Sequence, residues 1–395
     1  MKRILGRWAQ YLAIGLGAVS LSACQSLVPR TTPPQTTVET PTTPSDQGDQ
    51  QIENALPSDA QRHRIALLLP LSGKDSAVGQ SIANATMLAL LDTKANNIRI
   101  TNYDTARGAA AAAQRAIADG NKLILGPLFG DNVAPVAAVA RPANVPIVSF
   151  SNDVGVAGSD VFIIGYVPAQ SIDRVVDYAK SQGITRFAGL VPNGTYGQRA
   201  SSSLLTSVKQ VGGSVVTLQS FDRTTASLQA AIKRMQRDSE YQALLIADSG
   251  AMASKVVPLI RENGGADAQI LGTELWNTDN SLVRSADMRG AWFASVPDGL
   301  YRQYAAKYRQ QFGSDPFRLS SLGYDAVLLT TRIARGWKPG SAFPTDKLRD
   351  QGGFVGIDGT FRFNRFGIAE RLLEVQQVGS GTLSVVSPAP KSFEK

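Results

Sequence analysis

The chain has 395 residues, with one Cys, one His and a formal net charge of +8 from 40 basic and 32 acidic residues. A single Cys excludes a disulfide within the chain, and the same counts exclude metal sites built from Cys pairs or from several His. Hydrophobic residues at 43% and charged residues at 18% predict large apolar cores, and so small a charge excess does not indicate nucleic-acid binding.

The amino-terminal residues have the pattern of an export signal. Three basic residues precede an apolar stretch over residues 8–18, which is shorter than the roughly 20 apolar residues of a membrane-spanning helix. Leu-Ser-Ala-Cys follows at 21–24 and resembles the bacterial lipobox, where the signal is cut before a Cys that then carries lipid. We therefore predict a lipoprotein signal peptide over 1–23 and acylation of Cys24, with an ordinary secretory signal as the alternative. Gln25 stands where an Asp usually retains lipoproteins at the inner membrane, which favours anchoring at the outer membrane.

A linker is predicted between this signal and the folded part, over residues 24–61. It is rich in Pro and Thr and contains one Arg against five acidic residues, without any apolar period. This composition predicts a disordered tether, which if nearly extended would reach on the order of 100 Å at about 3.1 Å per residue. The chain from residue 61 onward carries a net charge of +9.

From residue 62 the pattern alternates between short apolar runs, typical of doubly covered strands, and longer segments with helical spacing. The first half predicts strands over 64–69, 98–103, 122–125 and 146–150 and helices over 77–94, 108–119 and 130–140. The second half predicts strands over 186–191, 214–221, 243–247 and 269–271 and helices over 168–181, 195–211, 227–237 and 251–262. Two parallel sheets flanked by helices follow from this alternation.

The remainder is mixed, with helices predicted near 299–312 and 321–336 and strands over 360–363 and 372–378. Phe361 and Phe363 are expected to share one face of their strand, while Arg362 points away.

Several motifs of this part are specific in their order and spacing. They are the first strand and loop at 65–73 with Gly79 beyond it, Ile-Leu-Gly-Pro-Leu at 124–128 followed by Val-Pro-Ile-Val-Ser at 145–149, Tyr196-Gly197, and the glycine-and-Phe hairpin at 356–367. Together they span about 62–378 and resemble the type I periplasmic-binding fold of leucine/isoleucine/valine-binding proteins.

A closer resemblance is to the penicillin-binding protein activators, outer-membrane lipoproteins whose carboxyl domain has this fold. Gly126-Pro127-Leu128 followed by Asp131-Asn132-Val133, and the strand that ends at Asp104, are similar to theirs. The better-known activators carry a helical-repeat domain before this one, and here the Pro/Thr linker occupies its place.

The resemblance implies an α/β fold of two lobes joined by crossovers near residues 166, 295 and 355. Lobe I is expected over 62–166 and 295–355, lobe II over 167–294 and 356–385, and a tail over 386–395. Two lobes on three connections can close about a cleft.

Ligands of such sheets bind beyond the carboxyl ends of the strands, and the residues there are the candidates for a cleft site. Glu274 resembles the acid that receives a ligand ammonium group in amino-acid binders, with a solvated loop acid as the alternative. Asp131 counts against a carboxylate ligand because it would repel one, and Asp131 or Asn132 is expected to cap the helix. For the others, turn hydrogen bonds or packing are the alternatives. The candidates are Phe129, Gly130, Ser149, Ser151, Asn152, Tyr196, Asp248, Ser249, Glu274 and Trp276.

Basic residues are frequent over 284–371. They indicate either an ordinary solvated surface or attraction to an acidic partner, a wall polymer or an anionic lipid. The candidate partner surface comprises Arg302, Arg309 and Arg318.

An enzyme is not expected, and neither is a metal or cofactor. His63, the only His, precedes the first strand on the side away from the cleft, and no phosphate-binding Gly-rich loop occurs in the folded part. The resemblance implies a lipid-anchored protein that stimulates a peptidoglycan-synthesising penicillin-binding protein. The alternative is the solute-binding component of an amino-acid ABC transporter, with a small molecule such as an amino acid in the cleft.

Overall fold

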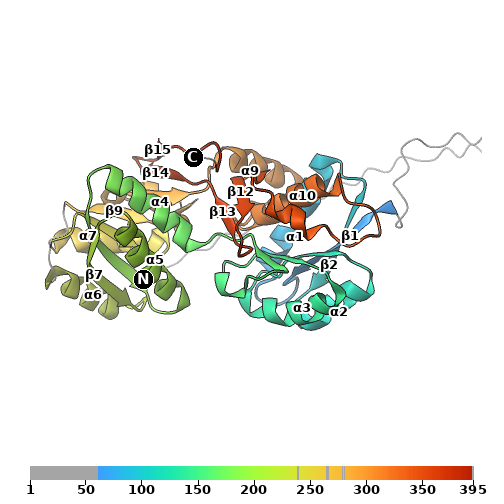
Figure 1. Ribbon diagram of the computed structural model, residues 1–395. Helices are drawn as coiled ribbons and strands as arrows, with labels where there is room; N and C mark the ends of the chain where they lie inside the picture. The colour runs from blue at the N-terminus through green and yellow to red at the C-terminus, as the bar shows by residue number, and fades with distance from the viewer. Residues whose placement is uncertain (1–60, 238–239, 264–266, 278, 280, 394–395) are drawn as a thin grey trace, which may run out of the picture. The chain divides into compact units, whose positions relative to one another are not determined.

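Residues 61–393, apart from 238–239, 264–266, 278 and 280, are described by a computed structural model (Figure 1). The predicted signal peptide, the acylated Cys24 and the linker lie outside the described residues. Two lobes follow, as the alternation of strands and helices predicts.

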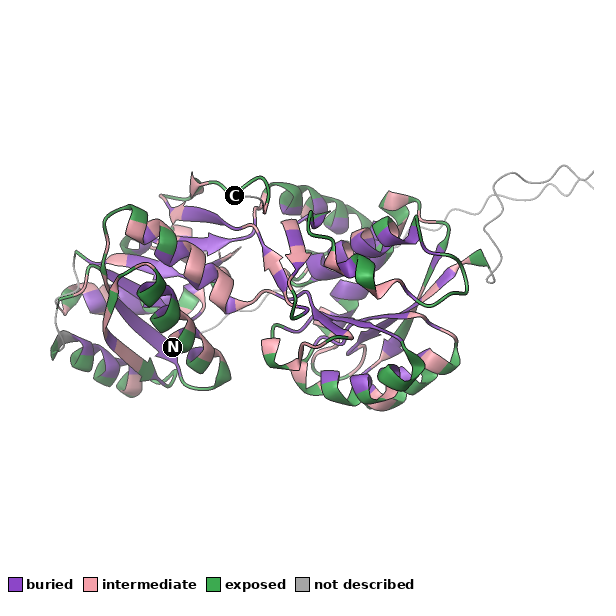
Figure 2. Cartoon of the chain, in the orientation of Figure 1, coloured by how far each residue is buried: buried purple, intermediate pink, exposed green. Residues whose placement is uncertain are grey.

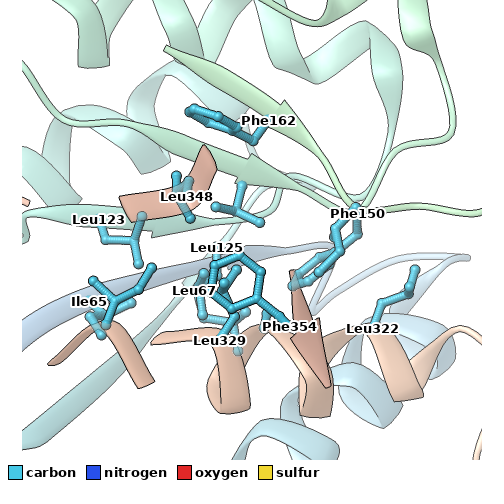
Figure 3. Packing of buried hydrophobic residues seen from close by; sticks show 14 of the residues in the cluster. Ile65, Leu67, Leu123, Leu125, Phe150, Phe162, Leu322, Leu329, Leu348 and Phe354 are labelled. Carbon is cyan, nitrogen blue, oxygen red and sulfur yellow. The ribbon is translucent and has the colours of Figure 1, made fainter. Parts of the chain in front are cut away.

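The sheet of lobe I has five strands, in the order β2-β1-β3-β4-β5, and every neighbouring pair is parallel. Side chains alternate along a strand, so Leu67 of β1 faces the core under helices α1 and α10 (Figure 3). Leu68 faces the core under α2 and α3. Burial on both faces explains the unbroken apolar run of β1. The elements are β1 (His63–Leu69), α1 (Ser76–Thr93), β2 (Ile98–Asp104), α2 (Ala109–Ala118), β3 (Leu123–Leu125), α3 (Val133–Ala140), β4 (Ile147–Ser149), β5 (Val161–Ile163), α9 (Gly299–Phe312) and α10 (Ser320–Ala334).

Lobe II contains a seven-stranded sheet in the order β15-β14-β10-β9-β8-β6-β7. The strands from β6 to β10 are parallel, which confirms the prediction for residues 186–271. The sheet as a whole is mixed, because β14 runs antiparallel to β10 and β15 antiparallel to β14 at one edge. The elements are α4 (Pro168–Ser181), β6 (Arg186–Pro192), α5 (Thr195–Gln210), β7 (Ser214–Phe221), α6 (Thr225–Arg237), β8 (Ala243–Ile246), α7 (Gly250–Glu262), β9 (Gln269–Gly272), α8 (Ser281–Arg284), β10 (Trp292–Ser295), β14 (Glu374–Val378) and β15 (Leu383–Ser387).

A separate three-stranded sheet corrects the predicted lobe boundary. It consists of β11 (Phe354–Gly356), β12 (Gly359–Phe363) and β13 (Ala369–Arg371). Phe361 and Phe363 are buried on one face, as predicted, but they pack in the core of lobe I, so residues 356–371 do not belong to lobe II. The third crossover therefore lies near residue 372 rather than near 355.

The carboxyl-terminal residues contact both lobes. β15 extends to Ser387, inside the predicted tail, and Arg174 of α4 donates to the Ser387 hydroxyl and, at 3.4 Å, to the Pro388 carbonyl. Beyond it, the Phe393 ring lies 4.4 Å from the guanidinium of Arg362 on β12. The tail thus adds a fourth link between lobe II and lobe I.

In both lobes a glycine makes a close backbone contact where the first strand leads into the next helix. In lobe I the backbone of Gly79 in α1 lies so close to the Pro70 carbonyl that a Cβ would come within 1.9 Å of its oxygen. In lobe II, Gly197 in α5 stands in the same relation to Pro192, at 1.6 Å. Figure 2 shows the strands and the inner helix faces as the buried parts of both lobes. The two glycines let each first helix pack directly onto the end of its strand.

We expect Gly197→Ala to lower the free energy of unfolding by about 1–3 kcal/mol, because backbone atoms must shift to admit the methyl group. Urea unfolding followed by circular dichroism measures the change. Gly299→Ala is the matched control, since nothing lies within 4 Å of a Cβ built there, and its effect should stay within about 0.5 kcal/mol. Equal stabilities for the two variants would contradict the packing explanation.

Candidate functional site

A cavity of about 500 Å³ lies at the carboxyl ends of the strands, with walls from both lobes. Lobe I contributes Phe129 after β3 and Asn152 after β4, and lobe II contributes Ser171 of α4 and Glu274 after β9. Much of the remaining wall is apolar, formed by Val78, Leu128, Phe150, Leu275, Leu319 and Leu373. This is the position at which open α/β sheets bind ligands.

Three of the ten candidate cleft residues line this cavity: Phe129, Asn152 and Glu274. The small residues of lobe I lie behind the wall instead. The Ser149 hydroxyl donates to the Pro127 carbonyl at 2.8 Å, and the Ser151 hydroxyl accepts from the Asp153 amide at 3.0 Å. Gly130 packs against this loop, with Asp153 and Ser151 next to its backbone. These three residues stabilise the turn through hydrogen bonds and packing, which was the stated alternative to ligand binding.

In lobe II, Trp276, Asp248 and Ser249 also lie outside the cavity wall. The Trp276 ring is fully buried, and its indole N–H donates to the Asp248 carbonyl at 2.9 Å. The Asp248 carboxylate accepts two bonds from Arg223, and the Ser249 hydroxyl caps α7 by accepting from the Met252 amide. Their roles within this region are therefore structural.

The predicted capping of α3 does not occur. Neither Asp131 nor Asn132 makes a side-chain capping bond, because residues 130–132 form a 3-10 turn that leads directly into the helix. The amide groups at the start of α3 are thus not satisfied by these side chains.

Glu274 is the most polar feature of the lobe II wall. Its carboxylate accepts from the Ser171 hydroxyl at 2.6 Å and from the Tyr196 hydroxyl at 3.2 Å. Desolvation by burial raises the pKa of Glu274, and burial likewise raises the pKa of Tyr196. Tyr196 is thereby placed behind Glu274 as a positioning residue. A cation or hydrogen-bond donor entering the cavity would stabilise the charged form of Glu274.

Sequence reasoning missed the ionic cluster on the opposite wall. Arg318 forms an ion pair with fully buried Asp358, 2.8 Å between Nη2 and Oδ1, and donates to the Tyr166 hydroxyl at 2.8 Å. The Tyr166 hydroxyl in turn donates to Asp358. Burial alone would raise the pKa of Asp358, but the Arg318 guanidinium holds it below its usual range. The expectation that Arg318 belongs to a partner surface is therefore wrong, because its side chain is only 15% exposed and is committed to this pair.

A second buried pair adjoins the first. Arg371 lies 3.7 Å from Asp325, measured from Nη1 to Oδ2, and both side chains are at most 2% exposed. The Asp325 carboxylate also accepts from the Ile357 amide at 2.7 Å. Burial, with the neighbouring Asp358 charge adding to it, raises the pKa of Asp325 to about 7. The only sequence signal for this cluster was the 356–367 hairpin motif, which contains Asp358.

The cavity wall combines apolar surface with a few polar side chains. Among the residues that line the described cavity there is no His or Cys, and its two arginines are each matched by a buried acid. Apolar surface with a few fixed hydrogen-bonding groups is typical of ligand pockets and of closed interfaces.

The Asp325 pair predicts a pH dependence of stability. The folded chain keeps a proton on Asp325 up to about pH 7, whereas the unfolded chain loses it near pH 4, so stability falls as the pH rises between these values. We expect the free energy of unfolding to fall less steeply with pH in Asp325→Asn than in the unchanged chain, by up to about 1.4 kcal/mol per pH unit. Urea unfolding at pH 5, 6 and 7 measures it, with exposed Asp346→Asn as the control. An unchanged slope in Asp325→Asn would rule out this proton.

Among the helices of the described residues, none is both long and apolar enough to cross a membrane. The family model for periplasmic binding proteins matches residues 63–382. A penicillin-binding protein activator of Mannheimia succiniciproducens is 25% identical over 293 residues, which are 68% of this chain and 47% of that protein. The chain spans about half the length of the first curated relatives that it matches, 48% and 47%.

Two solved structures show the same fold. One is that of a putative branched-chain amino-acid ABC transporter protein of Rhodospirillum rubrum, with a TM-score of 0.73 at 18% identity over 82% of this chain and all of that one. The other is the full-length activator of Haemophilus influenzae, with a TM-score of 0.65 at 19% identity over 83% of this chain and 59% of that one. With the family model matched over most of its folded part, the chain belongs to the periplasmic binding protein family.

Proposed function

We propose that this chain is a non-enzymatic lipoprotein of the periplasm that binds and activates a peptidoglycan-synthesising penicillin-binding protein. The observation that carries the proposal is the similarity to an activator over 68% of the chain, a stretch longer than either lobe alone. The lipobox-like Cys24 and the Pro/Thr-rich linker support an anchor with reach, at the inner leaflet of the outer membrane.

The cavity wall supports this reading over solute transport. A ligand carboxylate would need free hydroxyls and amides near β3 and β4, but Ser149 and Ser151 are engaged in their own turn and do not line the cavity. Phe129, which is 39% exposed, occupies the wall there instead. The hydroxyls of Ser149 and Ser151 are thus not available to an amino-acid carboxylate, and apolar surface lies in this part of the wall.

Helix α9 is the candidate contact for the partner. Its inner face is held by buried Tyr301, Tyr304 and Tyr308, which fixes the direction of the opposite face. Arg302 and Arg309 lie exposed on that outer side, and the pair that Arg309 makes with Asp315 is itself exposed and therefore weak. An acidic patch on the partner would meet two available guanidinium groups.

We expect Arg302→Glu combined with Arg309→Glu to weaken binding of the partner by at least about tenfold, because like charges would face each other. The chain is expressed from residue 24 with Cys24→Ser, and its binding to immobilised penicillin-binding proteins of the same organism is measured by interferometry. Stimulation of glycan polymerisation is recorded in parallel. Lys209→Glu combined with Lys233→Glu, exposed in lobe II, changes the net charge equally and should leave both readouts unchanged. If no such protein binds or is stimulated, the proposal fails; if the α9 variant binds normally, the surface is wrong.

A second function, solute binding for a branched-chain amino-acid ABC transporter, is favoured by one feature. Glu274 projects a carboxylate into the cavity wall, where it would pair with a ligand ammonium group. On the proposal above we expect calorimetry of the same chain to show no binding of leucine, isoleucine or valine. Micromolar binding that Glu274→Gln weakens by about 10-fold or more, while exposed Glu262→Gln does not, would establish transport instead.

A further inference from the structure

An ion pair joins the two lobes beside the cavity. Arg199 of α5, in lobe II, lies 2.6 Å from Asp153, which follows β4 in lobe I, measured from Nη2 to Oδ1. Their side chains are 35% and 29% exposed, so water screens the pair only in part. Asn152, directly before Asp153, lines both the cavity and a neighbouring hollow of about 280 Å³ whose wall also contains Arg199. The pair therefore lies where the lobes face each other.

The turn after β4 holds Asp153 in a fixed orientation. The Asp153 amide donates to the Ser151 hydroxyl at 3.0 Å, and its carboxylate accepts from the Gly155 amide at 2.8 Å. Gly130 leaves the space that this arrangement needs, because a Cβ built there would come within 3.0 Å of the Asp153 Cβ. Ser151 and Gly130 thus position an acid that pairs with lobe II, instead of lining the cavity themselves.

Arg199 also extends from a fixed part of the chain. Two residues before it, the close contact of Gly197 with the Pro192 carbonyl sets α5 against the end of β6. Tyr196, one residue earlier, donates to Glu274 of the cavity wall at 3.2 Å. An exposed ion pair is usually weak because ordering two long side chains costs conformational entropy. That cost is reduced here, since the short Asp153 side chain is already held by its turn.

The position of the pair distinguishes it from other ion pairs at the surface. Arg141 pairs with Asp160 at 2.9 Å, but both residues belong to lobe I. A hinge motion changes distances between the lobes and leaves distances within a lobe as they are. Rotation of lobe II away from lobe I would therefore separate Arg199 from Asp153 and leave Arg141 paired.

We propose that Arg199 and Asp153 form a latch that favours the arrangement in which the two lobes enclose the cavity. The latch consists of side chains of the chain itself, so it needs no ligand atom to form. A half-exposed pair changes such an equilibrium by about two- to fivefold, so closing is favoured without being locked. The proposal concerns the motion of the lobes and does not depend on the proposed activation.

The test uses the chain from residue 24 with Cys24→Ser, Gln114→Cys on α2 and Gln229→Cys on α6. The two new cysteines replace exposed residues, one in each lobe, and carry a donor and an acceptor dye. Single-molecule energy transfer then gives the ratio of open to closed molecules. We expect Arg199→Gln to raise this ratio by about two- to fivefold, and added salt to raise it in the unchanged chain. Arg141→Gln, which removes the pair inside lobe I, is the matched control and should leave the ratio unchanged.

A double-mutant cycle separates the latch from a general effect of charge. Asp153→Asn keeps an oxygen that can accept from the Gly155 amide, so the turn is retained. It should raise the ratio as much as Arg199→Gln does, and the double variant should add nothing further. Additive effects of the two changes would overturn the proposal, as would equal ratios for Arg199→Gln and Arg141→Gln.

Circular dichroism of each variant checks that the fold is retained. If Arg199→Gln does not fold, Asp153→Asn and the salt series of the unchanged chain decide the question, and no increase in the open fraction in either would overturn the latch. Because no penicillin-binding protein is present, failure of the latch and failure of the proposed activation are distinguishable.

Discussion

The arrangement of the two lobes depends on the buried ion pair between Arg318 and Asp358, because it lies where chain segments cross between them. Tyr166, at the first crossover, bonds to both partners, and Arg371, at the third, stacks on the Tyr166 ring at 5.2 Å. A buried ion pair costs desolvation, and removing one partner leaves a charge without compensation. The cluster therefore specifies one packing of the crossovers at some cost in stability. Three members of the cluster, Tyr166, Arg318 and Arg371, line the cavity, so the cluster also positions part of the cavity wall.

Gln170 of α4 links this cluster to lobe II. Its side chain accepts from the Arg371 amide at 2.9 Å and donates to the Ala369 carbonyl at 2.7 Å, which ties α4 to the end of β13. Ser171 follows directly and holds Glu274. One continuous chain of contacts thus connects the ion pair of one wall to the carboxylate of the other. The position of Glu274 is set by a chain of contacts that itself runs along the cavity wall.

The alternation of strands and helices could be predicted because doubly buried parallel strands require continuous apolar runs. Three strands of three residues each, β5, β11 and β13, escaped prediction, whereas β3 and β4, which are equally short, were predicted from their place in the alternation of strands and helices. The pattern of Phe361 and Phe363 correctly indicated a buried face, but periodicity does not say which core that face meets. At the site, topology predicted which loops reach the cleft. It could not predict that Trp276 turns inward, or that Arg318 finds its acid 40 residues later in the chain at Asp358.

The returning tail changes the mechanics expected of the hinge. Three closely spaced crossovers alone would permit both bending and twisting of one lobe against the other. The segment between Pro388 and Phe393 adds a fourth attachment, since it is held by Arg174 at one end and by Arg362 at the other. Arg174 also donates to the Leu373 carbonyl at 3.0 Å, so this attachment begins beside the third crossover. A fourth attachment leaves the two lobes less freedom to move against each other than three crossovers alone would. Two aromatic–cation and guanidinium–carbonyl contacts near the last residue of the chain thus limit how the cavity can open.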